Sequence, residues 1–182
     1  MNMKNSKLKL ALCAIFILAL FLRLIVVFNQ EESKKIPILD AKGYDILAVN
    51  ILSGNGFSKA MEGSTIPTSY RTPLYPLFLT GVYYIFGHSY MAVKVMQAIL
   101  SALVCIVIYF IVTIIYNEKR IGILSSLLTA IYVPFISWTP YYGTPAYLLS
   151  ENLYMPRVVF AILALIIFIK NEKILFGILT GI

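Results

Sequence analysis

Apolar stretches of membrane-spanning length alternate with short polar segments along the chain. A helix needs roughly 20 mostly apolar residues to cross a bilayer. The spans predicted on this basis are residues 10–28, 92–116, 121–138 and 147–169, with the start of a fifth at 174–182. The last run ends without a polar cap, which indicates an N-terminal fragment of a longer protein. The pattern as a whole predicts an all-α polytopic membrane protein.

Residues 29–91 form the long interruption between the first two spans and are predicted to be an external loop. Within it, residues 40–53 place apolar side chains at helical spacing, and Gly54-Asn55-Gly56 follows as a terminator. This pattern predicts a short helix at the membrane surface. Residues 57–70 show no regular period and are expected to be irregular.

The aromatic segment 73–87 has two interpretations, because it is apolar but shorter than a typical span. If it does not cross the membrane, Lys119-Arg120 and Lys170 share a side with the lysines that precede the first span. Basic loops favour the cytoplasmic side. The charge pattern therefore predicts an interfacial or re-entrant helix at 73–87.

Composition supports a membrane protein and argues against other classes. Hydrophobic residues make up 60% of the chain and charged residues 13%, whereas soluble domains average about 45–50% and about 25%. The net charge of +7 comes from scattered basic residues, so a membrane-side bias explains it better than nucleic-acid binding. Cys13 and Cys105 lie in apolar runs, which predicts two buried small side chains rather than a disulfide or a metal cluster.

Two carboxylates stand where predicted helices begin. Asp40 opens the surface helix, where it could act as a general base or a metal ligand, or simply cap the helix. Glu151 stands at the start of the fourth span. There its negative charge could simply interact with the positive end of the helix dipole, with Ser150 as the N-cap. On the predicted topology both acids face the same side of the membrane, so they could form one site.

Two arginines also leave alternatives open. Arg71 precedes a predicted helix, with Thr72 as N-cap and Pro73 as the first helical residue. A guanidinium beside a helix N-terminus suits an anion such as phosphate, and a lipid headgroup is the competing partner. Arg23 lies in the first span, where it either snorkels to the interface or faces the bundle and pairs with an acid of the outer loop.

The remaining polar and aromatic candidates are weaker. His88 has no histidine or cysteine near it in sequence and is interpreted as a surface or interfacial histidine. Lys94 and Arg157 lie near span ends, where they snorkel or neutralise a phosphate. Tyr44 and Tyr75 are candidates for lining a sugar site. The chain contains no glycine-rich phosphate loop and no HExxH, CxxC or GxSxG motif, which argues against soluble nucleotide chemistry.

Several short motifs follow one another across nearly all of residues 10–160. In chain order they are Asp40-x-x-x-Tyr44-x-x-x-Ala48, Gly54-Asn55-Gly56-Phe57, Tyr70-Arg71-Thr72-Pro73-Leu74-Tyr75-Pro76, Phe86-Gly87 and Ser150-Glu151. Their order resembles the N-terminal third of bacterial GT-C glycosyltransferases, the family 39-type group of protein O-mannosyltransferase-like and aminoarabinose-transferase-like enzymes. Many relatives carry an acidic residue or a histidine just before a proline pair. Here Arg71-Thr72 stand at that point and the prolines are separated.

The resemblance implies a membrane glycosyltransferase with an inverting mechanism. The donor would be a sugar on a polyprenyl-phosphate carrier, and the acceptor a lipid, glycan or protein at the outer face of a bacterial plasma membrane. Asp40 is implied as the base, Glu151 as the group that positions the acceptor or a divalent metal ion, and Arg71 as the neighbour of the donor phosphate. The metal ligands stay unassigned because the motif differs before the prolines. The fragment alone is expected to be inactive.

Two other functions remain as alternatives. A transporter or flippase fragment would carry broken helices and ionisable groups near mid-membrane, whereas the acids here lie in outer loops or at span ends. A non-catalytic scaffold subunit would tolerate Asp40→Asn and Glu151→Gln without loss of function.

Overall fold

Helices dominate the structure, as the apolar pattern predicts. The computed structural model describes residues 3–29, 40–61, 64–132 and 148–171. Its helices and strands are α1 (Met3–Phe28), α2 (Asp40–Leu52), β1 (Ser58–Met61), β2 (Ser64–Pro67), α3 (Leu74–Phe86), α4 (Tyr90–Tyr116), α5 (Lys119–Ile131) and α7 (Glu151–Asn171). The prediction of an all-α polytopic membrane module is confirmed, with one small hairpin added to it.

Three of the described helices are long and apolar enough to cross a membrane. They cover Ser6–Phe28, Tyr90–Tyr116 and Glu151–Lys170. The helix α3 is apolar but has only 13 residues, and α5 has the same length. The outer part of the predicted span 121–138 and the predicted start of a span at 174–182 lie outside the described residues.

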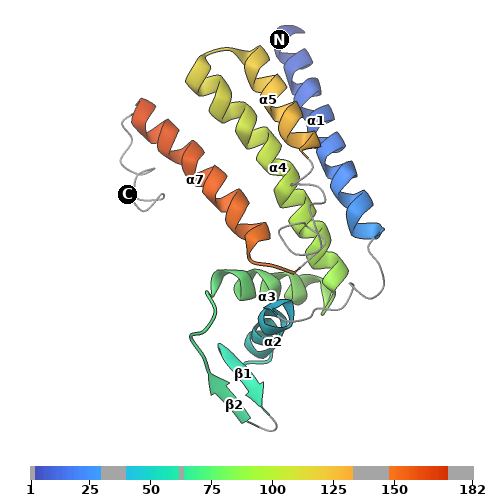
Figure 1. The fold of residues 1–182 in the computed structure, drawn as a ribbon, viewed down its shortest axis with the longest axis vertical. Coiled ribbons are helices and arrows are strands. Elements are labelled where there is room, and N and C mark those ends of the chain that lie inside the picture. The colour runs from blue at the N-terminus through green and yellow to red at the C-terminus, as the bar shows by residue number, and fades with distance from the viewer. Residues whose placement is uncertain (1–2, 30–39, 62–63, 133–147, 172–182) are drawn as a thin grey trace.

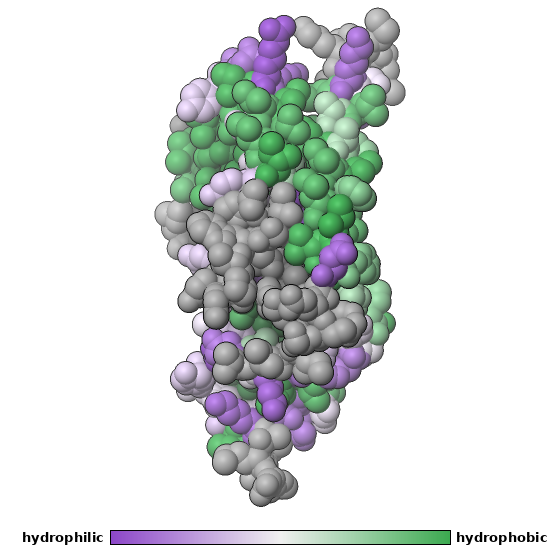
Figure 2. All heavy atoms as spheres, turned by 45° about the vertical axis from the view of Figure 1, so that its right-hand side comes forward, coloured by the Kyte–Doolittle hydropathy of each residue, from purple (hydrophilic) through white to green (hydrophobic). Residues whose placement is uncertain are grey.

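The central helix of the bundle is α4, which contacts α1, α5 and α7. The N-terminus of α1, the α4–α5 corner and the C-terminal end of α7 lie at one end of the bundle (Figure 1). At the other end, α3 lies across the helix ends, with α2 and the hairpin beyond it. Figure 2 shows hydrophobic side chains forming a band on one face, with hydrophilic ones gathered above and below it. This arrangement matches a bundle that crosses a bilayer and carries a further layer at one end. That layer, the outer layer, consists of α2, α3 and the β1–β2 hairpin.

The outer layer has its own apolar core. Tyr44 and Ala48 of α2 pack against Tyr75, Leu79 and other buried residues of α3, and Val93 and Leu148 join them. Thr80 strengthens this contact by donating a hydrogen bond to the carbonyl of Ala48 at 3.2 Å. The α2–α3 layer is therefore packed against the start of α4 and the residues that lead into α7.

The segment after α2 is a β-hairpin, so the expectation of an irregular stretch at 57–70 is wrong. Strands β1 and β2 pair antiparallel, with Ser58 opposite Pro67 and Met61 opposite Ser64. Asn50 of α2 fixes the base of the hairpin by donating to the carbonyl of Ser58 at 2.6 Å. The turn before it behaves as predicted, because Gly54 and Gly56 both adopt positive φ angles, which cost glycine little.

Two helix starts differ slightly from the prediction. Asp40 is the first residue of α2 rather than the cap before it. In α3 the N-cap position is held by Pro73, with no side-chain cap, and the helix begins at Leu74. The expected cap at Thr72 is therefore wrong by one residue.

Arg23 lies inside the bundle with its side chain fully buried, so it does not snorkel to the interface. Its Nε donates to Ser101 Oγ at 2.8 Å. Its Nη1 donates to the carbonyls of Ala19, at 2.8 Å, and Ala130, at 3.3 Å. The alternative prediction that Arg23 faces the bundle is confirmed. Within the described residues its partners are a hydroxyl, two carbonyls and the Cys105 sulfur, whereas Glu31, Glu32 and Glu62 of the predicted loop lie outside those residues.

The contact with Ala130 has a clear physical reason. Ala130 stands in the last turn of α5, where backbone carbonyls lack intrahelical partners and carry the negative end of the helix dipole. A carbonyl without a partner is costly in an apolar environment. Arg23 supplies both the hydrogen-bond donor and the positive charge. Cys105 is buried beside it, as predicted, whereas Cys13 is exposed on α1, which corrects the expectation for that residue.

The α4–α5 corner is tightly packed. Asn117 takes a left-handed conformation at φ 54°, and the Glu118 side chain accepts a hydrogen bond from the Arg120 backbone N–H. Gly122 then passes so close to α4 that a Cβ there would lie 2.2 Å from Thr113 Oγ1 and 3.0 Å from the Tyr109 carbonyl. Only glycine fits at this crossing without a shift.

Candidate functional site

The candidate site lies where α2, the start of α3 and the start of α7 meet, at the end of the bundle that carries the outer layer (Figure 1). Each of these segments brings at least one of the side chains selected from the sequence. α2 provides Asp40 and Tyr44, the residues just before α3 provide Arg71, the first turn of α3 provides Tyr75, and the start of α7 provides Glu151. The structure connects all five through a continuous series of contacts.

Asp40 and Arg71 form an ion pair. Arg71 Nη2 lies 2.5 Å from Asp40 Oδ1, and the Asp40 side chain is 63% exposed. The guanidinium carbon of Arg71 lies 4.9 Å from the ring centre of Tyr44 and 5.0 Å from that of Tyr70. The hydrogen bond to Asp40 raises the pKa of Arg71 above its usual value. Arg71 is therefore a fixed cation beside an exposed carboxylate.

Tyr44 connects α2 to the start of α7. Its hydroxyl donates to Ser150 Oγ at 3.1 Å, and Ser150 in turn donates to Glu151 Oε2 at 3.3 Å. The two hydrogen bonds point in the same direction, toward the Glu151 carboxylate. The two acids predicted to share a site are thus linked through Arg71, Tyr44 and Ser150.

Tyr75 forms the wall behind this series. Its ring packs edge-on against that of Tyr44, with centres 5.0 Å apart, and its hydroxyl donates to Gln97 Oε1 of α4 at 2.5 Å. Burial, assisted by the nearby Tyr44 and the negative charge of Glu151, raises the pKa of Tyr75 well above its usual value. Tyr75 therefore remains a neutral hydroxyl at ordinary pH.

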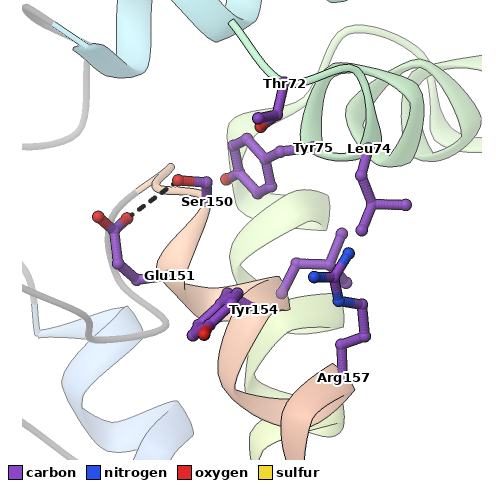
Figure 3. Close-up of a pocket in the computed structure, with 8 residues that line it drawn as sticks. Thr72, Leu74, Tyr75, Ser150, Glu151, Tyr154 and Arg157 are labelled. Carbon is purple, nitrogen blue, oxygen red and sulfur yellow. Dashed lines mark hydrogen bonds between the residues drawn. The ribbon is translucent and has the colours of Figure 1, made fainter. Parts of the chain in front are cut away.

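A pocket of about 370 Å³ opens beside Glu151. It is lined by Thr72, Leu74, Tyr75, Ser150, Glu151, Leu153, Tyr154 and Arg157. Figure 3 shows Glu151 on one side and the Arg157 guanidinium near Leu74, with Tyr154 between them on α7. Arg157 also lies over the Tyr154 ring, at 5.8 Å. The pocket thus holds an acid and a cation on one helix, against the start of α3.

A second polar cluster, centred on Asp45, was missed from the sequence. Asp45 is only 9% exposed. Its Oδ1 accepts from Tyr83 at 2.7 Å and lies 2.8 Å from His88 Nε2, and its Oδ2 accepts from Tyr90 at 3.1 Å. The His88 side chain is 46% exposed, so it does reach the surface as predicted, but it is paired rather than alone.

A signal for this cluster was present in the sequence. Asp45 stands at helical spacing from Ala41, Ala48 and Val49, at i−4, i+3 and i+4, so it shares a helix face with small and apolar residues. A carboxylate on an apolar face needs hydrogen-bond donors from another segment. The sequence did not say which segment would supply them.

A divalent metal ion does not fit the described residues well. Within residues 3–29, 40–61, 64–132 and 148–171 there is no group of three or more histidine, cysteine, aspartate or glutamate side chains that could hold one. Asp40 already faces a guanidinium, and Glu151 accepts from a serine. No step of the chemistry below is therefore assigned to a metal.

Comparison with known proteins supports the family expected from the motifs. Residues 70–182, more than half of the chain, match the family model described as dolichyl-phosphate-mannose-protein mannosyltransferase. No curated protein and no solved structure matches the chain. The matched range contains Arg71, Tyr75, Glu151 and Arg157, while Asp40 and Tyr44 precede it. With its membrane-spanning helices, the chain therefore belongs to the dolichyl-phosphate-mannose-protein mannosyltransferase family and is an integral membrane glycosyltransferase of GT-C type.

Proposed function

We propose that the protein transfers a sugar from a polyprenyl-phosphate carrier to the hydroxyl of an acceptor, with inversion at the sugar carbon. The reaction takes place at the outer face of the plasma membrane, where α2 and α3 cover the end of the bundle. The observation that carries this proposal is the series of contacts from Asp40 to Glu151 beside a pocket that also holds Arg157.

In this reaction Asp40 acts as the general base. It takes the proton of the acceptor hydroxyl while the acceptor oxygen attacks the anomeric carbon of the sugar. The bond between that carbon and the phosphate oxygen breaks, and the carrier phosphate leaves with the electron pair. The exposure of Asp40 suits this role, because a base must reach its substrate.

Arg71 and Arg157 balance the charge of the leaving phosphate. Arg71 uses Nη2 for Asp40, and a guanidinium has further N–H groups that can bind an anion. Arg157 lines the pocket on the side of α3. It is the cation of the pocket lining, and Glu151, on the same helix, is the acid. Developing negative charge is stabilised most by cations and dipoles that are already in place.

Glu151, Tyr44 and Tyr75 position the acceptor. The hydrogen bonds from Tyr44 and Ser150 orient the Glu151 carboxylate, which then accepts from an acceptor hydroxyl. The neutral Tyr75 ring gives the pocket an apolar wall against which a sugar ring can lie. The acceptor class, whether lipid, glycan or protein, is left to experiment.

The test uses the full-length protein in membrane vesicles with radiolabelled polyprenyl-phosphate mannose and a parallel set of other polyprenyl-phosphate sugars. Transfer is followed as label that leaves the carrier. Asp40→Asn is expected to lower kcat by about 100-fold or more, the usual contribution of a general base. Arg157→Gln is expected to raise the KM for the donor. Lys42→Gln, which removes an exposed charge from the same helix as Asp40, is the matched control and keeps wild-type rates.

The same assay separates the alternatives. An Asp40→Asn protein that transfers sugar at the wild-type rate would remove Asp40 from the mechanism. A flippase would instead move the labelled lipid across the vesicle membrane without releasing its sugar. A scaffold subunit would show neither activity, with Asp40→Asn and Glu151→Gln both silent in cells.

A further inference from the structure

The Asp45 cluster ties α2 to the opposite end of α3 from the candidate site. Tyr83 stands in the last turns of α3, His88 lies in the corner between α3 and α4, and Tyr90 is the first residue of α4. All of them bond to the one carboxylate. The His88 ring also packs edge-on against both tyrosines, with centres 4.6 Å from Tyr83 and 5.0 Å from Tyr90.

Burying a carboxylate at a core position costs desolvation free energy. Its desolvation is offset only when donors satisfy its oxygens, as they do here. An apolar side chain would pack at lower cost but would lose these directional contacts between α2 and the α3–α4 corner. Hydrogen bonds have a preferred direction and length. The cluster therefore fixes the rotation of α2 in a way that apolar packing does not.

The fixed rotation matters because site residues stand on the same helix. Tyr44 directly precedes Asp45, and Asp40 lies five positions earlier, about 7.5 Å along the axis at 1.5 Å per residue. Tyr44 must reach Ser150, and Asp40 must reach Arg71. A small turn of α2 would move both of these side chains together.

We infer that Asp45 is a positioning residue: with Tyr83, His88 and Tyr90 it holds α2 in the rotation that places Asp40 and Tyr44 at the site. The inference rests on the proposed function for its consequence in catalysis. Its geometric part, the placement of α2 relative to α7, can be measured in a protein whose substrate is still unidentified.

The experiment measures that placement directly. Spin labels are attached to cysteines at the exposed positions Lys42 on α2 and Phe160 on α7, after Cys13 and Cys105 have been replaced by alanine. Distances between the labels are recorded in the full-length protein in lipid nanodiscs. Asp45→Ala is expected to broaden or shift the distance distribution, and Asp45→Asn, which keeps an oxygen acceptor, is expected to restore most of it.

Asn50→Ala is the matched control. Asn50 is also buried on α2 and also loses a hydrogen bond when replaced, but its partner is the Ser58 carbonyl of the hairpin. The Asn50→Ala protein is expected to keep a narrow distance distribution even though it loses about as much thermal stability as Asp45→Ala. If Asp45→Ala does not fold, His88→Phe and Tyr90→Phe each keep the ring but remove one polar contact to the Asp45 carboxylate, and they provide the same comparison.

Kinetics supply the second readout. With polyprenyl-phosphate mannose as donor, Asp45→Ala is expected to lower kcat by about 10- to 100-fold with the donor KM little changed, because displacements near 1 Å have effects of about this size. A distance distribution in Asp45→Ala that keeps both the position and the width of the wild-type one, or an unchanged kcat, would overturn the inference. If the wild type itself transfers no sugar, the proposed function fails, and the distance measurement alone decides whether Asp45 positions α2.

Discussion

The hydroxyl of Tyr44 donates a hydrogen bond to the hydroxyl of Ser150, which lies 106 positions further along the chain. Tyr44 belongs to the surface helix α2, and Ser150 immediately precedes the spanning helix α7. The bond therefore joins a part of the outer layer to the membrane-embedded part of the molecule. Ser150 lies within residues 70–182, which match the family model, and Tyr44 lies before them, so the bond joins the matched and unmatched parts of the chain.

Removing this bond should weaken the site without unfolding the protein. Tyr44→Phe and Ser150→Ala are each expected to lower kcat/KM for sugar transfer by roughly 3- to 10-fold, since a typical hydrogen bond contributes about 0.5–1.5 kcal/mol. The double variant should lose little more than Ser150→Ala alone, because both single changes remove the Tyr44–Ser150 bond and Ser150→Ala also removes the bond to Glu151. Tyr84→Phe, at an exposed tyrosine of α3, is the control. Fully additive losses would show that the two hydroxyls act separately.

Arg23 should be required for a stable bundle. Arg23→Leu leaves the Ala130 carbonyl and the Ser101 hydroxyl without their donor inside the bundle, at a cost of about 1–3 kcal/mol for each unsatisfied group. The thermal unfolding temperature of the purified protein in detergent is expected to fall. Lys9→Leu, at an exposed position of the same helix, should change it little. A lipid-facing arginine would give the opposite result, with Arg23→Leu more stable than the wild type.

The α4–α5 corner offers a second stability test. Gly122→Ala is expected to destabilise the protein by about 1–3 kcal/mol, because the new methyl group meets Thr113 and the Tyr109 backbone. Gly81→Ala is the matched control on α3, where nothing lies within 4 Å of the added Cβ. That change should be neutral or stabilising by up to about 1 kcal/mol through helix propensity.

Thr113 lies on the α4 side of the contact with Gly122 and offers a further test. Its buried hydroxyl has no hydrogen-bond partner among the described residues. Thr113→Val should therefore leave stability unchanged or raise it slightly. A large loss on Thr113→Val would mean that the hydroxyl has a partner essential to the corner.

The orientation of the bundle can be tested with single cysteines at positions 151 and 119. Glu151 begins α7 at the end that carries α2 and α3, whereas Lys119 begins α5 at the opposite end. A membrane-impermeant thiol reagent is expected to label position 151 in intact cells and position 119 only after permeabilisation. Cys13 and Cys105 are replaced beforehand. The reverse pattern would place the proposed site on the cytoplasmic side.

The features that sequence could predict were those set by neighbours along the chain. Helical spacing and a glycine turn locate α2, and aromatic apolar residues after a proline locate α3. The hairpin escaped prediction because each strand has four residues, too few for a clear alternation. The motif order did select Asp40, Arg71 and Glu151, which the structure links.

Contacts between distant segments could not be predicted in the same way. Asp45 bonds to residues 38 to 45 positions away, and no local pattern specifies such a pairing. Arg23 shows a related limit. A helix that is apolar on every side gives no hydrophobic face by which to choose between lipid and bundle. Only the packing of α1 against α4 and α5 decides the direction of this side chain.

The buried arginine also bears on how the chain enters the membrane. α1 is synthesised before α4 and α5, so Arg23 meets the bilayer before Ser101 and Ala130 have been made. Arginine disfavours insertion of a lone helix by up to about 3.5 kcal/mol at its centre and by less toward its ends, and Arg23 lies nearer the end than the centre of the span Ser6–Phe28. The packing of α1 is therefore expected to be completed only after α5 has been made, because Arg23 gains its partners on α4 and α5 only then.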